Sequence, residues 1–599
     1  MRGHLVNIIE QKIIPVEMLI EEGVIRAINP IDTTNPAGVA SIGTGGPYIL
    51  PGFVDAHVHI ESSLLIPSEF ARMAVVHGTI ATVSDPHEIA NVCGMPGIEF
   101  MIKNGKTVPF YFNFGAPSCV PATRFETAGA TLDVAAVTTL LERDDIKYLS
   151  EMMNFPGVLH KDPEVMEKIA AARRLGKPVD GHAPGLRGEE ARQYIAAGIS
   201  TDHECFTAEE ALDKLQDGMH ILIREGSAAK NFEALIPLLN DYPGQIMFCS
   251  DDKHPDSLLA GHIDKLCARA VAKGIDVFKV LRAACINPVK HYNLEHGQLR
   301  PGDPADFIVV EDLTNFRVLM TYIKGECVAA NGTTKLVSTH LVSPNPTSAG
   351  GMLAASPVNN FKAEPRQVKD FAYYLDKWGE QENVEQVYCI EALDGQLITN
   401  KLIIPIADIV LKEGRLHSNP EKDILKIVVV NRYTAAPVAK SFIKGFGLRR
   451  GAIASSVAHD SHNIVAVGVD DESICHAINA IIAAKGGLSC IAPSPTAPAT
   501  TAPDATGPAA QATAASPTAS ASGPLASSLL LSLPVGGLMS MDDGYRVAEA
   551  YTAIDSMAKD LGSNLAAPFM TLSFMALLVI PHLKLGDLGL FDGDKFALL

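Results

Sequence analysis

Residues 51–59 have the sequence Pro-Gly-Phe-Val-Asp-Ala-His-Val-His, a turn followed by a short apolar strand that ends in two histidines. Side chains alternate along a strand, so His57 and His59 project from the same face and both imidazoles can reach one metal ion. An isolated His-x-His pair is common, and a strand with two buried or surface histidines would explain it equally well. The interpretation as a metal site therefore depends on the rest of the chain.

Three further strand candidates end in the same residue types. His182 follows one strand in Asp-Gly-His-Ala-Pro, His203 follows the next in Asp-His-Glu, and Asp251 follows the last in Ser-Asp-Asp. Each alone has an ordinary explanation, since a histidine can be a hydrogen-bonded core residue and an aspartate can cap a helix. Together, imidazole and carboxylate groups suit zinc, iron or manganese, and their number suits two ions.

These residues belong to a regular alternation of strands and helices. Eight apolar strands are predicted to end near His59, Asp85, Asn113, Glu151, His182, His203, Arg224 and Asp251. Most intervals are about 20–35 residues, which is what a strand–helix unit needs. Asp162-Pro163 predicts the start of a helix over residues 164–175, and the sequence from Thr207 to Glu210 predicts a capping box for residues 208–215. The pattern predicts an α/β fold, a (β/α)8 TIM-type barrel with its site at the carboxyl ends of the strands.

The sequence changes character outside the barrel. We expect a small flanking β domain from residues 1–48 and 302–345, the barrel over 49–301, a connecting segment over 346–400, and a C-terminal α+β domain over 401–599. Residues from about 490 to 527 consist almost wholly of Ala, Pro, Thr and Ser. Such a segment buries too little apolar surface to offset the entropy lost on ordering, so we expect an unstructured insertion.

Charge and cysteine content exclude several classes of function. The 49 Lys and Arg residues against 68 Asp and Glu give a net charge of −19, which disfavours nucleic-acid and anionic-membrane binding. The ten cysteines include no Cys-x-x-Cys pair, which favours a reduced, cytoplasmic protein. Residues 569–580 are apolar but too short for a membrane span, and we expect a core segment there. We expect small-molecule partners and a homo-oligomer.

The motifs resemble those of the amidohydrolase superfamily and, more narrowly, of the bacterial adenine deaminase family. HxH is shared across the superfamily, whereas DPHE and SEMMN are more specific, and the resemblance covers nearly the whole chain outside the insertion. The supporting segments are PGFVDAHVHIESS (51–63), DPHEIAN (85–91), SEMMNFP (150–156), GHAPG (181–185), TDHECF (201–206), SDDKH (250–254), AHDSHNIVAVG (458–468), PVGGLMS (534–540) and residues 570–591.

This resemblance implies a ligand set and a reaction. Many members of the superfamily bridge their two metals with a carboxylated lysine at the end of the fourth strand, whereas the adenine deaminase family has a glutamate there. The resemblance therefore implies that Glu151 bridges two divalent ions, Mn²⁺ first and Fe²⁺ or Zn²⁺ as alternatives. Lys147, four residues earlier, lies too deep in its strand to take that place. The other ligands would be His57, His59 and Asp251 at one ion and His182 and His203 at the second. The reaction implied is hydrolysis of adenine to hypoxanthine and ammonia in purine salvage. A hydroxide that bridges the metals would attack C6, and Asp251 would accept and pass on its proton.

The loop after the second strand holds the candidates for substrate contact. Attack on C6 places electron density on a ring nitrogen, which needs a proton donor, and Glu88 is our candidate. Asp85 and His87 are candidate substrate-binding residues, with turn formation and helix capping as the alternative explanation. Glu61 and Glu204 are weaker candidates for substrate contact.

The sequence from His459 to His462, His-Asp-Ser-His, contains the residue types of a hydrolytic triad. Residues this close in sequence rarely reach triad geometry. A structural turn, or a contribution to the mouth of the barrel, is the better interpretation.

Two other functions remain open at this point. A different hydrolase on the same barrel could cleave a cyclic amide or amidine, and the loops after the second and fourth strands argue for adenine instead. A non-catalytic barrel scaffold is the second alternative, and such proteins usually lose metal ligands.

Deletion of residues 492–522 should leave folding and activity nearly intact. Long surface insertions add little loop-closure entropy, and this one has no apolar face to pack. Thermal unfolding and ammonia release, compared with the full chain, test this expectation. A large drop in melting temperature would show that the segment is structural.

Overall fold

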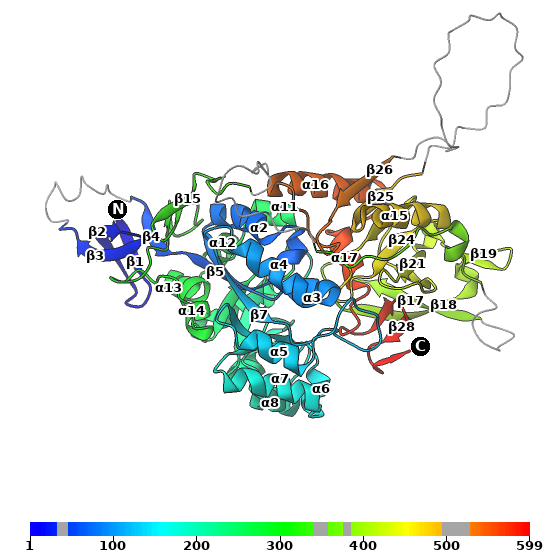
Figure 1. Cartoon of the computed structure of the whole chain (residues 1–599), viewed down its shortest axis with the longest axis horizontal. Helices are drawn as coiled ribbons and strands as arrows, with labels where there is room; N and C mark the ends of the chain where they lie inside the picture. The colour runs from blue at the N-terminus through cyan, green and yellow to red at the C-terminus, as the bar shows by residue number, and fades with distance from the viewer. Residues whose placement is uncertain (33–45, 339–357, 375–384, 494–526) are drawn as a thin grey trace, which may run out of the picture.

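The computed structural model describes residues 1–32, 46–338, 358–374, 385–493 and 527–599. Three parts lie in a row along the long axis of the molecule: a β sheet next to the N-terminus, a central barrel, and a C-terminal α+β part (Figure 1). The fold class predicted from the sequence is confirmed.

The barrel consists of parallel strands in a five-stranded and a three-stranded sheet. They are β5 (Phe53–Val58), β6 (Thr79–Ser84), β7 (Tyr111–Ala116), β8 (Ile146–Met152), β9 (Val179–Gly181), β10 (Thr201–Asp202), β11 (His220–Arg224) and β12 (Ile246–Cys249). A parallel bridge from Val58 to Asp251 and a hydrogen bond from Ser200 N to Val179 O join the two sheets. The strands end close to the predicted residues, with the largest difference at β7, which runs past Asn113.

Helices fill the intervals between these strands. They are α2 (Pro67–Ala74), α3 (His87–Cys93), α4 (Met95–Gly105), α5 (Val134–Leu141), α6 (Phe155–Leu159), α7 (Pro163–Arg174), α8 (Gly188–Ala196), α9 (Ala208–Gln216), α10 (Phe232–Leu235), α11 (Pro255–Ala260), α12 (Ile263–Ala272), α13 (Val277–Leu281) and α14 (Asn287–His291). Asp162 caps α7 as predicted, accepting from the N–H groups of Glu164 and Val165. At α9 only half of the predicted capping box forms: Thr207 accepts from Glu210 N, while the Glu210 carboxylate binds other partners.

The flanking sheet contains strands from both sides of the barrel segment. Its order is β16-β15-β14-β13-β4-β1-β2-β3. The strands are β1 (Arg2–Asn7), β2 (Lys12–Glu21), β3 (Val24–Pro30), β4 (Tyr48–Pro51), β13 (Phe307–Val310), β14 (Val318–Ile323), β15 (Glu326–Ala330) and β16 (Thr333–Thr334). The antiparallel pair of β13 with β4 joins the two segments. This sheet therefore brings together the two segments that enclose the barrel in sequence.

The C-terminal part is built on a second eight-stranded sheet, with the order β18-β17-β22-β21-β24-β23-β25-β26. Its strands are β17 (Gln386–Ala392), β18 (Thr399–Pro405), β21 (Leu425–Val430), β22 (Ala439–Lys444), β23 (Ala452–Ser455), β24 (Ile464–Gly468), β25 (Gly487–Ile491) and β26 (Ser528–Ser532). The smaller elements are β19 (Val410–Lys412), β20 (Arg415–His417), α15 (Asp471–Ala484), β27 (Leu583–Gly586), β28 (Gly589–Asp592) and β29 (Ala597–Leu598).

Two sequence expectations bear on this part. β17 lies inside residues 346–400, where we expected a connecting segment, so the sheet begins earlier in the chain. Its buried residues are Val387, Cys389, Ile390 and Ala392, so the alternation expected of a strand with one buried face is broken at Cys389 and Ile390. The interior of the expected insertion, residues 494–526, lies outside the described residues, and β25 and β26 on either side pair antiparallel.

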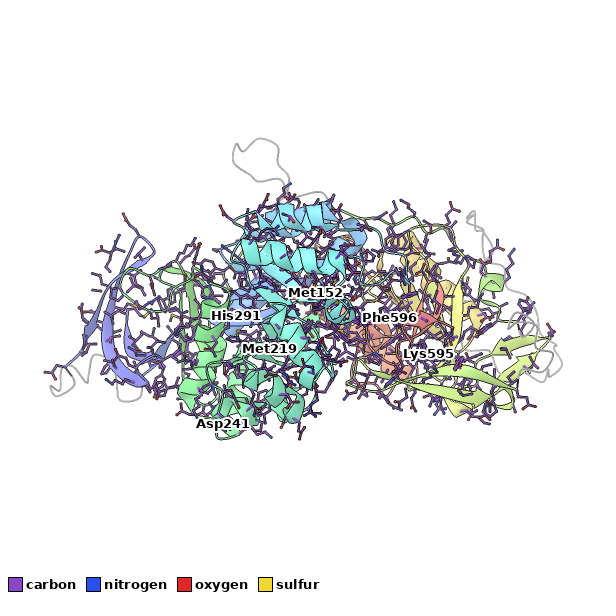
Figure 2. All side chains as sticks on the ribbon, turned by 90° about the horizontal axis from the view of Figure 1, so that it is seen from below. Met152, Met219, Asp241, His291, Lys595 and Phe596 are labelled. Carbon is purple, nitrogen blue, oxygen red and sulfur yellow. The ribbon has the colours of Figure 1, made fainter. Side chains whose placement is uncertain are left out.

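The C-terminal part packs directly on the barrel. Helix α16 (Gly544–Asp560) lies beside α2 and α11 (Figure 1), and Arg72 of α2 forms an ion pair with Asp543 at 2.8 Å. On another side, the Phe125 ring of the barrel lies 5.5 Å from that of Phe596, which Figure 2 labels near this junction. The two parts therefore meet at the end of the barrel where the carboxyl ends of the strands lie.

The apolar segment at residues 569–580 is mostly buried and overlaps α17 (Pro568–Phe574), as expected of a core segment. Among the described residues, no helix is both long enough and apolar enough to cross a membrane.

We predict that Lys214→Met destabilises the barrel. Lys214 Nζ is buried and donates to Ala183 O (2.8 Å), Asp202 Oδ2 (2.5 Å) and Glu210 Oε1 (2.8 Å). Its loss leaves Asp202 buried without its cation, which costs about 3–5 kcal/mol. The urea unfolding midpoint at neutral pH should therefore fall.

The matched control is Lys273→Met. Lys273 pairs with Glu233, but their side chains are 53% and 61% exposed, and such pairs contribute about 0–1 kcal/mol. Equal shifts in the two variants would contradict a structural role for the buried pair.

Candidate active site

The six residues predicted to bind metal meet at the carboxyl end of the barrel, and all are buried. They are His57 in β5, His59 directly after it, Glu151 in β8, His182 after β9, His203 after β10, and Asp251 after β12. Parallel strands bring their carboxyl ends to one end of a barrel, so residues far apart in sequence become neighbours.

His57, His59 and Asp251 form one group of potential ligands. The Nε2 atoms of His57 and His59 lie 3.2 Å apart. Asp251 Oδ1 lies 3.6 Å from the first and 3.2 Å from the second. This oxygen is buried and has no hydrogen-bond partner among the described residues. An anionic oxygen and two imidazole nitrogens that face one another suit a shared cation.

Glu151 connects this group to the second pair of histidines. Its Oε1 lies 3.2 Å from His59 Nε2 and 3.9 Å from His57 Nε2. Its Oε2 lies 2.7 Å from His182 Nδ1 and 3.3 Å from His203 Nε2. The carboxylate therefore lies between the two groups.

Opposite charges keep the buried carboxylates ionised. Burial would raise the pKa of Glu151, but His182 and His203 hold it well below its usual range. Burial also opposes ionisation of Asp251, yet the Arg224 guanidinium, with His57 and His59, holds its pKa well below the usual range. Both side chains are therefore anions at neutral pH.

Arg224 was missed as a functional residue, because the sequence analysis treated it only as the end of a strand. Its guanidinium is fully buried, donates to Asp251 Oδ2 at 2.8 Å and also binds the Glu204 carboxylate. The available signal was an arginine directly after the apolar run Ile221–Ile223. An unpaired arginine is rarely buried, so a carboxylate partner could have been expected.

Hydrogen bonds behind the potential ligands fix their orientation. His59 Nδ1 lies 3.2 Å from Asp85 O, which favours the tautomer that leaves Nε2 free to bind a metal. Asp55 accepts from Ser250 N at 2.9 Å and contacts His262 Nε2 at 2.8 Å, which ties the end of β12 to β5. Asp251 itself has φ = +55°, a conformation that non-glycine residues rarely adopt and that often occurs at functional sites.

The loop after β6 lies beside these groups. Asp85 Oδ1 accepts from His87 N at 3.0 Å, and Asp85 Oδ2 lies 3.1 Å from His87 Nδ1. His87 Nδ1 is also 3.4 Å from Glu151 Oε1, and His87 Nε2 is 3.4 Å from Glu88 Oε1. The candidate substrate-binding residues therefore lie within reach of the potential ligands.

Glu88 contacts the C-terminal part. His459 Nδ1 lies 2.6 Å from Glu88 Oε1, and His462 Nε2 bonds to Glu88 Oε2. All three side chains are buried. His459 and His462 thus contribute to the mouth of the barrel, which was one of the two interpretations offered from sequence.

A small cavity joins these groups. Its lining includes five of the potential ligands, the loop residues His87 and Glu88, and four residues of the C-terminal part, Leu397, His459, Asp460 and Leu577. Its volume of about 20 Å³ is enough for a water molecule and far too small for a purine.

The two weaker candidates differ in position. Glu204 Oε1 lies 3.5 Å from His203 Nε2 and lines the cavity. Glu61 lies outside that lining and accepts from Ile89 N at 3.2 Å, and burial raises its pKa to about 7. Asp252 and Asp460, which the sequence analysis did not select, also line the cavity.

Comparison with known proteins assigns two regions of the chain. Residues 48–328 match the amidohydrolase family, and residues 396–496 and 524–597 match the adenine deaminase C-terminal domain. A solved beta-aspartyl dipeptidase from Fervidobacterium islandicum AW-1 aligns with 57% of this chain and 100% of its own, at 16% identity and a TM-score of 0.42.

Curated relatives align over the full length. An adenine deaminase from Sulfurovum sp. is 50% identical over 597 residues, covering 100% of this chain and 98% of that protein. Adenine deaminases from Salinibacter ruber and Methanosarcina mazei are 49% and 47% identical, each covering 99% of this chain and 97% and 98% of their own. The chain therefore belongs to the adenine deaminase family, within the amidohydrolases.

Proposed function

We propose that this chain hydrolyses adenine to hypoxanthine and ammonia. One observation carries the proposal: a single cavity is lined by five of the six proposed barrel ligands together with residues of the adenine deaminase C-terminal domain. The first group suits activation of water and the second suits proton transfer to a nitrogen heterocycle. The names of the full-length relatives support the same substrate.

We infer that two divalent ions occupy the site, Mn²⁺ first, with Fe²⁺ or Zn²⁺ as alternatives. The ligands would be His57, His59 and Asp251 at one ion, His182 and His203 at the other, and Glu151 between them. The unpartnered, buried Asp251 Oδ1 facing two imidazole nitrogens fits such an ion. When bound, two divalent ions lower the pKa of a coordinated water toward neutrality.

The chain's own residues would then move protons and position the substrate. Asp251, held as an anion by Arg224, would accept a proton from the attacking water and pass it to the departing amino group. Asp85 and His87, next to Glu151, would contact the ring. Glu88 would govern protonation of a ring nitrogen, because its carboxylate lies among three imidazoles at the cavity.

Purine binding requires more space than the described cavity offers. Leu397 and Leu577 are its lining residues from the C-terminal part that carry no polar group. We propose that they move outward to admit the ring and then cover it, which excludes bulk water during the reaction.

The domain boundaries given in the sequence analysis are likewise proposed, with 49–301 as the catalytic barrel, except that the C-terminal domain begins before residue 401 so that it includes β17. The homo-oligomeric state and the location in the cell stay predictions.

The double variant His57→Ala with His59→Ala should lose at least one of two bound metal ions. Six ligands of mixed type are too many for one tetrahedral ion, and this change removes two from the same group. Metal content per chain, measured on purified Mn²⁺-loaded protein, tests the assignment. The control is His291→Gln, a partly buried histidine bonded to Ser200 outside this cluster. Unchanged metal content in the double variant would refute the ligand set.

Manganese-loaded protein should release ammonia rapidly from adenine and poorly from adenosine. Ammonia release is also measured with guanine and cytosine, and ring opening is measured with dihydroorotate. Asp251→Asn should retain much of its metal yet lose ~10²–10⁴-fold in turnover, because a proton acceptor is removed while a ligand oxygen remains. If adenine is inert and dihydroorotate is opened, the chain is a different amidohydrolase.

A further inference from the structure

We propose that His459, from the C-terminal part, is the proton donor to the purine ring nitrogen, and that Glu88 and His462 hold it in position. This inference rests on the proposed adenine deamination. It changes the role expected for Glu88 from sequence, from that of the donor itself to that of its anionic partner.

Glu88 has no free carboxylate oxygen with which to donate a proton. Oε1 accepts from His459 Nδ1 at 2.6 Å and Oε2 accepts from His462 Nε2. A carboxylate whose two oxygens accept hydrogen bonds is stabilised as the anion. Burial would raise the pKa of Glu88, but His459, His87 and His462 hold it well below the usual range.

The tautomer of His462 is set by the backbone. Ala458 N–H donates to His462 Nδ1 at 3.1 Å, so that nitrogen carries a lone pair and the ring proton lies on Nε2. Nε2–H then donates to Glu88. Burial lowers the pKa of His462 to about 4, so it is neutral at physiological pH and acts as a fixed donor.

His459 has the opposite character. With Nδ1 on Glu88, its Nε2 is buried, has no hydrogen-bond partner among the described residues, and lies 3.9 Å from Asp252 Oδ1. The residue lines the same cavity as the metal ligands. Burial would lower its pKa, but Glu88 and Asp252 raise it to about 9. His459 is therefore an imidazolium at neutral pH with one N–H available to the cavity.

His87 is the competing donor, because both of its ring nitrogens are buried without a hydrogen-bond partner among the described residues. His87 Nδ1, however, lies 3.4 Å from Glu151, which is a proposed metal ligand. His459 Nδ1 instead binds Glu88, which is outside the proposed ligand set. A group beside the proposed metal ligands is a poorer place for a proton once cations bind there.

The proposed step balances as follows. As the water oxygen bonds to C6, the C6–N1 π pair moves onto N1, which takes the proton from His459 Nε2. Asp251 passes the first water proton to the amino group, the C6–N bond breaks, and ammonia leaves. The remaining hydroxyl proton returns to the imidazole as C6=O forms. Water and adenine become hypoxanthine and ammonia, with every proton assigned.

His459→Gln should lower kcat by ~10²–10⁴-fold, the contribution of general acid catalysis. KM for adenine, hypoxanthine binding measured by calorimetry, metal content and melting temperature should stay close to those of the unmodified chain. His291→Gln is the control, since it makes the same substitution at a partly buried histidine outside the site. His291 lies toward the flanking sheet, on the opposite side of the barrel from the C-terminal part (Figure 2), and all its kinetic values should be unchanged.

A second variant tests the positioning role of Glu88. Without its negative charge the pKa of His459 falls, so Glu88→Gln should move the basic limb of the kcat–pH profile to lower pH. The other groups that face His459 are Asp252, Asp460, His462 and His254, and all are retained in this variant. The same profile in His291→Gln should match that of the unmodified chain.

The outcomes separate the two proposals. Full turnover in His459→Gln, or lost activity explained by lost metal, lost hypoxanthine binding or unfolding, would overturn the role of His459. An unshifted basic limb in Glu88→Gln would overturn the role of Glu88. If the unmodified, metal-loaded chain fails to deaminate adenine, the proposed function fails first and independently.

Discussion

Buried negative charge at the mouth of the barrel is the constraint on which the site depends. Glu151, Asp251 and Glu88 are each almost completely buried. An uncompensated carboxylate inside a protein is so costly that it normally takes up a proton instead. Each is therefore surrounded by donors: imidazoles around Glu151 and Glu88, and Arg224 beside Asp251. The dense cluster of histidines follows from the same requirement, because imidazole can compensate a carboxylate or bind a metal.

The barrel framework meets this constraint by holding the ends of its strands rigidly. The Asp55 carboxylate accepts a hydrogen bond from Ser250 N–H and contacts His262. The end of β12 is therefore attached to β5 one residue before Asp251. That attachment accompanies the unusual backbone conformation of Asp251, with φ = +55°. Strain of this kind persists only where neighbouring contacts over-determine the position. The charged groups are thus held in place before any ligand binds.

The features that could be predicted from the sequence are those whose signal lies within a few neighbouring residues. The barrel strands and His57 with His59 depend on alternation and spacing within a few residues, and these predictions agree with the structure. The pairing of His459 with Glu88 joins positions 371 apart, so no local pattern contains it. Arg224 was overlooked because its carboxylate partners come from other strands. β17 was missed because its burial does not alternate regularly, with the adjacent Cys389 and Ile390 both buried.

The contacts between Glu88 and the two histidines also show that the C-terminal part contributes directly to the site. Removing it would leave Glu88 without two of the three imidazoles that compensate its charge, and would remove Leu397 and Leu577 from the cavity. Glu88 would then be hydrated, and water instead of the fixed imidazoles of His459 and His462 would compensate its charge. A polar group that is shielded from bulk water interacts far more strongly than one in water. Closure of the C-terminal part over the barrel therefore assembles the proton-transfer groups and strengthens them in one step.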